Sequence, residues 1–161
     1  MTSPSLDDTI IRAARDADSG AVIRLIARVF AEYPGCLLDV DGEEPELRNP
    51  ATSFERFWVA ERCAEIVGCC ACSRAPDRLE LKKCYVARSE RGRGTGRRLI
   101  AMVEAHARRL GLRKIELWTD TRFDTAHAVY RHLGYRATGR RRELGDISGT
   151  TELHFVKELS T

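Results

Sequence analysis

The residues that most directly predict chemistry form a glycine-rich turn, Arg91-Gly92-Arg93-Gly94-Thr95-Gly96, between a strand-like and a helix-like segment. The first N–H groups of a helix have no partner within it, and the helix dipole makes that end partly positive. Glycines allow an anion to approach these groups closely. Five arginines within eleven positions could neutralise phosphate charge: Arg88, Arg91, Arg93, Arg97 and Arg98. The turn therefore predicts an anion site, with a plain structural turn beside a solvated basic helix face as the alternative.

Two other phosphate-binding motifs do not fit this turn. A P-loop needs Lys and then Ser or Thr after its last glycines, whereas Arg97 and Arg98 follow Gly96. A dinucleotide-binding fold needs Gly-x-Gly-x-x-Gly, and this glycine spacing differs, although Asp120 could supply the acid of that motif. Only 41 residues follow Asp120, too few to complete a doubly wound sheet. The anion then belongs either to a single phosphorylated ligand of another kind or to a nucleic-acid backbone.

A second motif follows the turn, at Ala126-His127-Ala128-Val129-Tyr130-Arg131-His132-Leu133-Gly134-Tyr135. It looks like the helix end Ala-x-x-x-Tyr-x-x-x-Gly-Phe of the GNAT superfamily of N-acetyltransferases. Arg91, Gly94 and Gly96 match the other family signature, which is Arg or Gln, two residues, Gly, one residue, then Gly or Ala. The chain resembles this superfamily by motif over about residues 79–135, and by the order of its elements in the N-terminal half. The resemblance implies an acyltransferase that moves an acetyl group from acetyl-CoA to a primary amine, directly, in a ternary complex.

The resemblance also implies where acetyl-CoA binds. The backbone of Cys84, Tyr85 and Val86 would pair with the pantetheine arm, and the amides from Gly92 to Arg97 would hold the pyrophosphate. The expected cofactor-binding residues are Cys84, Tyr85, Val86, Arg91, Gly92, Arg93, Gly94, Thr95, Gly96 and Arg97. Many members carry an Asn seven residues before the helix Tyr to contact the pantetheine, whereas this chain has Phe123 there.

Acetyl transfer to an amine needs a base, because an alkylammonium must lose its proton before it can attack the thioester. Glu80 is the first candidate: it lies on the strand that leads to the turn and aligns with the catalytic Glu of histone acetyltransferases in this superfamily. Glu116, on the next strand, is the second candidate. A surface pairing of Glu80 with Lys82 is the structural alternative.

The leaving thiolate needs an acid, and Tyr130 is the expected donor because a phenol can give up its proton and regain it from water. An ordinary core tyrosine is the alternative. Cys84 could instead carry the acetyl group covalently, but no His lies nearby in the sequence to activate it, and direct transfer is usual in the family.

The sequence is less informative about the acceptor than about acetyl-CoA. An acidic segment could form a wall for a cationic amine, and we expect Asp39 and Asp41 in it to bind the acceptor; a solvated loop is the alternative.

Two other functions remain open. One is a non-catalytic acyl-CoA-binding module of the same fold. The other, which the separated basic clusters disfavour, is a nucleic-acid binder that uses Arg140-Arg141-Arg142.

Composition and cysteine placement indicate one globular domain in the cytoplasm. The chain has 161 residues, 43% hydrophobic and 32% charged, with a net charge of +3 and no apolar run near the roughly 20 residues of a membrane span. Three of the six cysteines, Cys69, Cys70 and Cys72, crowd into one run, which suits reduced residues better than disulfides. No Cys or His spacing predicts a metal site. We expect a monomer or homodimer.

Hydrophobic periodicity and turn residues predict the order of the elements. Strands are expected at 10–14, 57–62, 65–73, 79–86, 114–119, 135–142 and 151–158. Helices are expected after Asp16 or Asp18, after the glycine turn as far as Gly111, and at 125–133, with 38–50 as a loop or broken helix. The fold class is α/β, with a mixed, mostly antiparallel GNAT-like sheet of about seven strands flanked by about four helices. Residues 1–161 would form a single domain, with 79–135 as its acetyl-CoA-binding core and 1–8 flexible.

Overall fold

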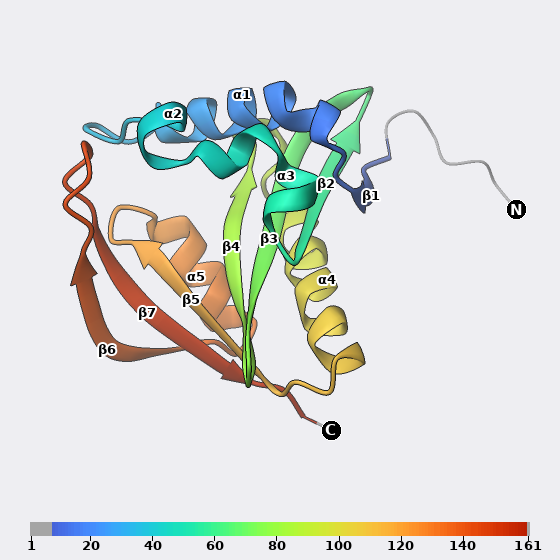
Figure 1. Cartoon of the computed structure of the whole chain (residues 1–161), viewed down its shortest axis with the longest axis vertical. Coiled ribbons are helices and arrows are strands. Elements are labelled where there is room, and N and C mark those ends of the chain that lie inside the picture. Colours follow the sequence, from blue (N-terminus) through green and yellow to red (C-terminus); the bar gives the residue numbers. More distant parts are fainter. Residues whose placement is uncertain (1–7, 161) are drawn as a thin grey trace, which may run out of the picture.

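A seven-stranded sheet in the order β1-β2-β3-β4-β5-β7-β6 forms the centre of the computed structural model, which describes residues 8–160 (Figure 1). Residues 1–7, most of the segment expected to be flexible, lie outside the described residues. The strands are β1 Ile10–Ala13, β2 Arg56–Arg62, β3 Glu65–Ala75, β4 Arg78–Val86, β5 Lys114–Asp120, β6 Arg136–Glu143 and β7 Thr151–Glu158. Neighbouring strands run antiparallel except β4 and β5, which run parallel. The predicted mixed, mostly antiparallel sheet is confirmed.

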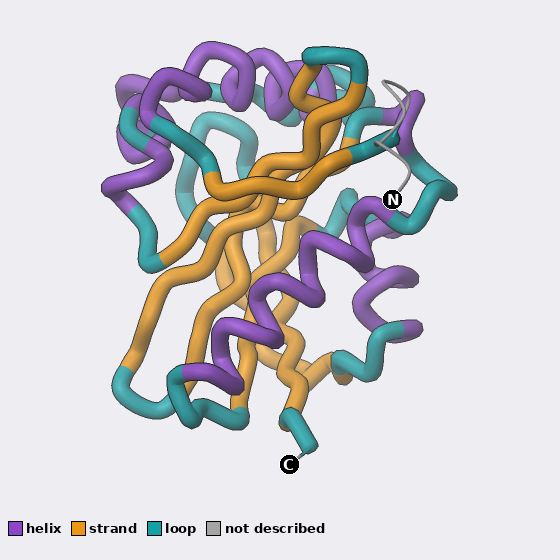
Figure 2. The backbone as a smooth tube through the Cα atoms, turned by 90° about the vertical axis from the view of Figure 1, so that its right-hand side faces the viewer, coloured by secondary structure: helices purple, strands orange, loops and turns teal. Residues whose placement is uncertain are grey.

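Helices cover both faces of this sheet (Figure 2). The longer ones are α1 Ser19–Phe30, α4 Thr95–Arg109 and α5 Asp124–His132, and the short ones are α2 Val40–Glu43 and α3 Pro50–Ser53. Single 3₁₀ turns lie at Asp16–Asp18, Pro45–Arg48 and Arg88–Glu90. The segment 38–50, expected as a loop or broken helix, thus consists of short helical turns. Two prolines at the starts of such turns prevent a continuous helix, because proline lacks the N–H that the helix interior requires.

The cysteine-rich strand β3 passes through the middle of the core. Cys70 and Cys72 belong to the hydrophobic cluster beneath α4 and α5, whereas Cys69 belongs to the cluster beneath α1. All three are fully buried free thiols. Because successive side chains of a strand point to opposite faces, small apolar residues on both faces let helices pack on each side. These three cysteines therefore belong to the core.

A bulge in β4 opens the sheet where the site lies. Cys69 pairs with Tyr85 and Ala71 with Lys82, so two residues of β4 oppose the single residue between them on β3. One of the two, Lys83, has a positive φ of 52°. The parallel pairing of β4 with β5 covers only the three residues 79–81, and beyond them the strands diverge (Figure 1). Bulges increase local twist and end pairing, which accounts for the opening.

Candidate active site

Two cavities meet in the opening between β4 and β5. The first, which we call the loop cavity, has a volume of about 560 Å³ and extends from the glycine turn along α5. The second, the acidic cavity, has a volume of about 490 Å³ and lies between β4, β5 and the acidic segment 43–46. Five residues line both cavities: Cys84, Tyr85, Phe123, Ala126 and Tyr130. Ligands held in the two cavities would therefore meet beside these residues.

The glycine turn lies at the N-terminus of α4, as the sequence predicted. Gly92 and Gly94 both have a φ of 80°, and a Cβ on Gly92 would meet no atom within 4 Å, so space is open beside it. Gly94 caps the helix and its carbonyl accepts a hydrogen bond from the Arg98 N–H at 3.0 Å. The N–H groups of residues 95–97 precede that bond and have no partner within the helix. Their arrangement around the mouth of the loop cavity is the geometry that binds an anion.

The carboxylate of Glu90 is fully buried and holds this turn by hydrogen bonds from inside the protein. It accepts hydrogen bonds from the hydroxyls of Thr9 at 2.6 Å and Thr95 at 2.8 Å, and from Nε of Arg62 at 2.7 Å. Burial alone would raise the pKa of Glu90, but these three donors outweigh burial and hold the pKa below its usual range. Sequence reasoning missed this residue, although a single acid inside an arginine-rich segment was a signal for it.

The motif arginine, Arg91, turns its side chain toward the protein. Its two terminal nitrogens donate to the carboxylate of Glu32 at 2.6 and 2.7 Å, and its Nε donates to the Val86 carbonyl at 3.2 Å. The guanidinium thus joins the turn to the residues that follow α1 and to the end of β4. Arg97 lines the loop cavity with an exposed side chain, and so it is the better-placed cation for a phosphate.

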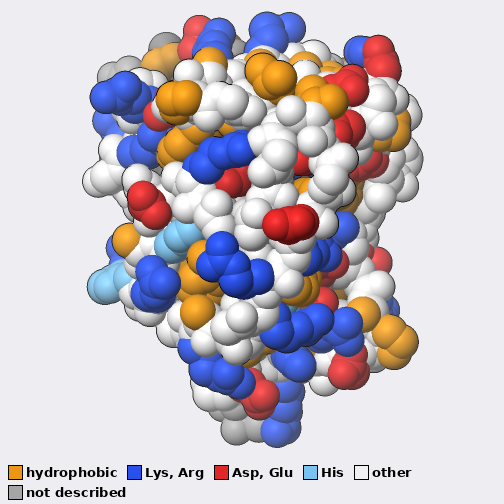
Figure 3. Space-filling model, turned by 90° about the vertical axis from the view of Figure 1, so that its left-hand side faces the viewer, with side chains coloured by type: hydrophobic (Ala, Val, Ile, Leu, Met, Phe, Trp, Pro, Cys, Tyr) orange, Lys and Arg blue, Asp and Glu red, His pale blue; other side chains and the backbone are white. Residues whose placement is uncertain are grey.

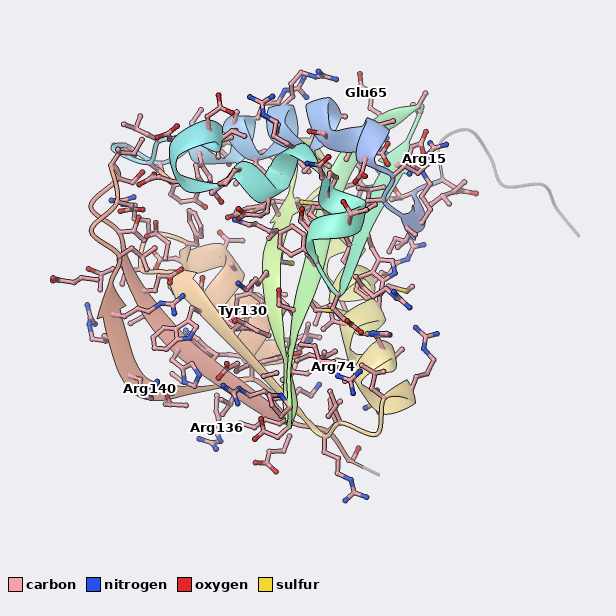
Figure 4. All side chains as sticks on the ribbon, viewed as in Figure 1. Arg15, Glu65, Arg74, Tyr130, Arg136 and Arg140 are labelled. Carbon is pink, nitrogen blue, oxygen red and sulfur yellow. The ribbon has the colours of Figure 1, made fainter. Side chains whose placement is uncertain are left out.

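Tyr130, a residue of α5, lies where the two cavities join (Figure 4). It is 5% exposed and packs near the rings of Tyr135 and Phe155, with centroids at 6.0 and 6.1 Å. The helix that carries it ends at Gly134, whose φ is 93°. Burial raises the pKa of Tyr130 well above the usual tyrosine value, so the phenol keeps its proton at neutral pH and is a weaker acid than an exposed tyrosine.

The two candidate bases are neighbours in the sheet but differ in surroundings. Glu80 and Glu116 are register partners on β4 and β5, and of the two only Glu80 is among the described residues that line the cavities. Lys82 approaches Glu80 at 3.8 Å, which leaves the Glu80 carboxylate loosely paired at the floor of the acidic cavity.

Glu116 is instead held inside the sheet. Its carboxylate lies 2.8 Å from Nε of Arg78 and 3.1 Å from Nε2 of His154. Burial raises the pKa of Glu116, but the positive charge of Arg78 beside it and the hydrogen bond from His154 outweigh burial and lower it overall. A carboxylate stabilised in this way binds a proton weakly, so the geometry favours Glu80 as the base.

The acidic segment faces the acidic cavity, but through other residues than expected. Asp39 caps α2 by accepting from the Gly42 N–H at 3.0 Å, and exposed Asp41 pairs with Arg48 at 3.0 Å. Neither aspartate lines a cavity among the described residues. Three glutamates of the same segment do line the acidic cavity: Glu43, Glu44 and Glu46.

Comparison with known proteins assigns the family of this fold and site. The model of the acetyltransferase (GNAT) family matches residues 24–135. The chain belongs to the GNAT acetyltransferase family. It is 29% identical over 147 residues to the uncharacterized N-acetyltransferase YjgM of Escherichia coli K12, covering 84% of this chain and 86% of that one.

Solved structures agree with this GNAT assignment at the level of the fold. A GNAT acetyltransferase from Staphylococcus aureus Mu50 superposes with a TM-score of 0.82 at 21% identity, over 95% of this chain and all of that one. The YncA protein of Salmonella typhimurium, solved with its cofactor acetyl-CoA, superposes with a TM-score of 0.71 at 17% identity, over 96% and 95% of the two chains.

Phe123 gives this GNAT protein an aromatic wall where many relatives carry an amide. Its ring lies 4.9 Å from that of Tyr33, 6.1 Å from Phe30 and 6.3 Å from Tyr85, measured between centroids. Phe123 lines both cavities, so this aromatic wall presents an apolar surface at their junction.

The second arginine cluster of the GNAT chain lies on the edge strand β6. The labelled Arg136 and Arg140 lie away from Tyr130 (Figure 4). Arg140 and Arg142 cover the Trp118 ring at 5.2 and 4.2 Å, and Arg142 also pairs with Glu152 at 2.7 Å. On the face shown in Figure 3, charged side chains of both signs are interspersed with hydrophobic ones. The cluster is therefore engaged with the sheet, and the surface around it is not uniformly basic.

Within residues 8–160, no helix of the GNAT chain is both long and apolar enough to cross a membrane. In the same part of the chain, no three His, Cys, Asp or Glu side chains gather where they could hold a metal ion.

Proposed function

We propose that this GNAT protein transfers the acetyl group of acetyl-CoA to a primary amine, directly, within a ternary complex. The observation that carries the proposal is that the loop cavity and the acidic cavity meet at Tyr130. One cavity ends at N–H groups suited to phosphate, and the other is rich in carboxylates suited to a cation. Acetyl-CoA supplies an activated acyl group as a thioester.

The donor side fits CoA by shape and by hydrogen bonding. Open space beside Gly92 and the N–H groups of residues 95–97 suit the pyrophosphate. At residues 84–86, past the end of the pairing with β5, β4 offers backbone groups to the amides of a pantetheine arm. Cys84, Tyr85 and Val86 line the loop cavity, which supports the same path.

The residues around Tyr130 account for the proton transfers. Glu80 accepts the proton of the substrate ammonium, directly or through water, and the freed amine attacks the thioester carbonyl. Tyr130 donates its phenolic proton to the departing sulfur and regains a proton from solvent. Cys84 lines both cavities, so acetylation of its thiol is the competing route.

The test is thiol release from acetyl-CoA across a panel of amines, amino acids and peptides, with mass spectrometry of the acceptor. We expect release that depends on an amine and yields one acetylated product per thiol. CoA should also raise the melting temperature, since a ligand that binds only the folded state stabilises it. A thermal shift with CoA but no thiol release with any acceptor would favour the non-catalytic binding module. The absence of both the thermal shift and the thiol release would overturn the proposal.

A further inference from the structure

The acidic cavity carries an excess of negative charge. Its lining contains seven carboxylates, Glu43, Glu44, Glu46, Glu80, Asp120, Asp146 and Glu152, against three cationic side chains, Lys82, Lys83 and Arg142. Each cation already faces a carboxylate: Lys83 pairs with Glu44 and Glu46, Arg142 with Glu152, and Lys82 approaches Glu80. The cavity therefore attracts a cationic group and repels a substrate carboxylate.

Exposed apolar side chains lie at the mouth of the same cavity. Four large hydrophobic side chains are exposed among the described residues: Ile10, Leu37, Leu144 and Ile147. Leu37 is 56% exposed and Leu144 is 45% exposed, and both line the acidic cavity. Ile147, 55% exposed, follows in the same loop as Leu144. Apolar side chains held at the mouth of a ligand cavity mark a surface that a ligand would cover.

These apolar side chains are held in place by hydrogen bonds across the mouth. The Ser148 hydroxyl accepts from the Leu37 N–H at 2.8 Å and donates to the Leu37 carbonyl at 3.1 Å. The Ile147 N–H donates to Glu43 at 3.0 Å. The loop 144–150 and the segment 36–43 thus form one connected rim.

Aromatic side chains add to the apolar lining of this cavity. Phe30, Trp118 and Phe123 line it together with Tyr130. A bound molecule would meet carboxylates near its reacting nitrogen and apolar surface along its length.

We propose that the acceptor is a primary amine joined to an apolar chain and carrying no carboxylate, with the chain lying against Leu37 and Leu144. This inference rests on the proposed function and narrows its substrate class. The ammonium enters toward Glu80, where the carboxylates stabilise it before its proton is removed. The chain leaves toward the rim, where it covers side chains that are otherwise exposed.

The test compares three matched acceptors: pentylamine, ethylamine, which lacks the chain, and norleucine, which is pentylamine with a carboxylate beside the amine. We expect kcat/KM for pentylamine to exceed that for each of the others by about tenfold or more, the size that apolar contacts give in substrate discrimination. In Leu37→Ser and Leu144→Ser the preference over ethylamine should shrink through a higher KM for pentylamine. Ile10→Ser, equally exposed at the other end of the sheet on β1, is the control and should keep the preference.

Each contrary outcome has a separate meaning. Equal use of the three amines, or unchanged preference in both leucine variants, would overturn this inference while the acetyltransferase function stands. A wild-type dimer that both leucine variants convert to monomers, without altered selectivity, would assign the rim to a second copy of the chain and would also overturn it. If no acceptor of any kind gave thiol release, the proposed function itself would be overturned.

Discussion

The guanidinium of Arg91 forms a two-pronged ion pair with Glu32, from Nη1 to Oε1 at 2.6 Å and from Nη2 to Oε2 at 2.7 Å. The first residue of the family signature thus holds the turn in place rather than reaching outward with its side chain. Its backbone remains part of the loop cavity. The geometry of the proposed CoA site thus depends on a residue 59 positions away in the sequence.

Glu32→Gln should weaken CoA binding because it releases the turn. We expect a loss of about 1 to 3 kcal/mol in the free energy of unfolding, the range for a hydrogen-bonded charged group that loses its partner. Calorimetric titration with CoA should show a higher Kd. Glu61→Gln is the matched control, since Glu61 pairs with Arg12 at 2.9 Å on β1 and β2. If Glu61→Gln lost as much CoA affinity as Glu32→Gln, the loss would reflect general destabilisation and not release of the turn.

Gly92→Ala should impair binding beyond its effect on stability. A side chain at a φ of 80° costs about 1 to 2 kcal/mol, and the new methyl would occupy the anion's approach. Gly111→Ala is matched, with a φ of 73° and equally open surroundings after α4. Both variants should lose similar stability, but only Gly92→Ala should raise the Kd for CoA, by about tenfold or more, as when one charge-assisted hydrogen bond is lost. A normal Kd in Gly92→Ala would remove the turn from the donor site.

Glu80→Gln should lower kcat by about a hundredfold or more, the usual contribution of a general base. Glu116→Gln should destabilise the sheet, because Arg78 and His154 lose their carboxylate, yet keep most of its activity below the melting temperature. Rates for both variants at saturating acetyl-CoA, with CoA affinity measured alongside, separate the two candidates. A large loss of kcat in Glu116→Gln with little change in Glu80→Gln would instead assign the base to Glu116 on β5.

Tyr130→Phe should lower kcat by about a hundredfold or more while leaving the Kd for CoA nearly unchanged, because only the donated proton is lost. Tyr135→Phe removes the hydroxyl of another buried tyrosine, which contacts Glu104 at 3.3 Å and lines neither cavity among the described residues. It should retain activity. Unchanged turnover in Tyr130→Phe would leave the thiolate without its assigned acid.

The predictions that succeeded from sequence rest on local patterns. Glycine at positive φ before a helix, a tyrosine on an amphipathic helix and alternating strand residues are short-range features. The strands expected at 57–62 and 65–73 leave only Cys63 and Ala64 between them. Neither is glycine, yet both adopt a positive φ, 51° and 60°, in the turn between the paired strands β2 and β3. Burial on each side of the turn outweighed the weak turn chemistry.

The features that sequence reasoning missed depend on contacts between distant segments. Glu90 joins residues from three parts of the chain, and no spacing indicates that Thr9 and Arg62 approach it. The composition of the acidic segment predicted an acidic wall, but it did not predict which of its residues would line the cavity. Asp39 became a helix cap, which is a common role for an aspartate just before a helix, and the glutamates after it reached the cavity instead.

The central claim is direct transfer where the two cavities meet, and initial rates with acetyl-CoA and amine both varied test it most directly. Combined with rapid-quench mass spectrometry of the enzyme, they separate direct transfer from an acetylated intermediate. Direct transfer predicts intersecting double-reciprocal lines and no acetylated protein in the absence of amine. Parallel lines together with acetyl on Cys84 would contradict it.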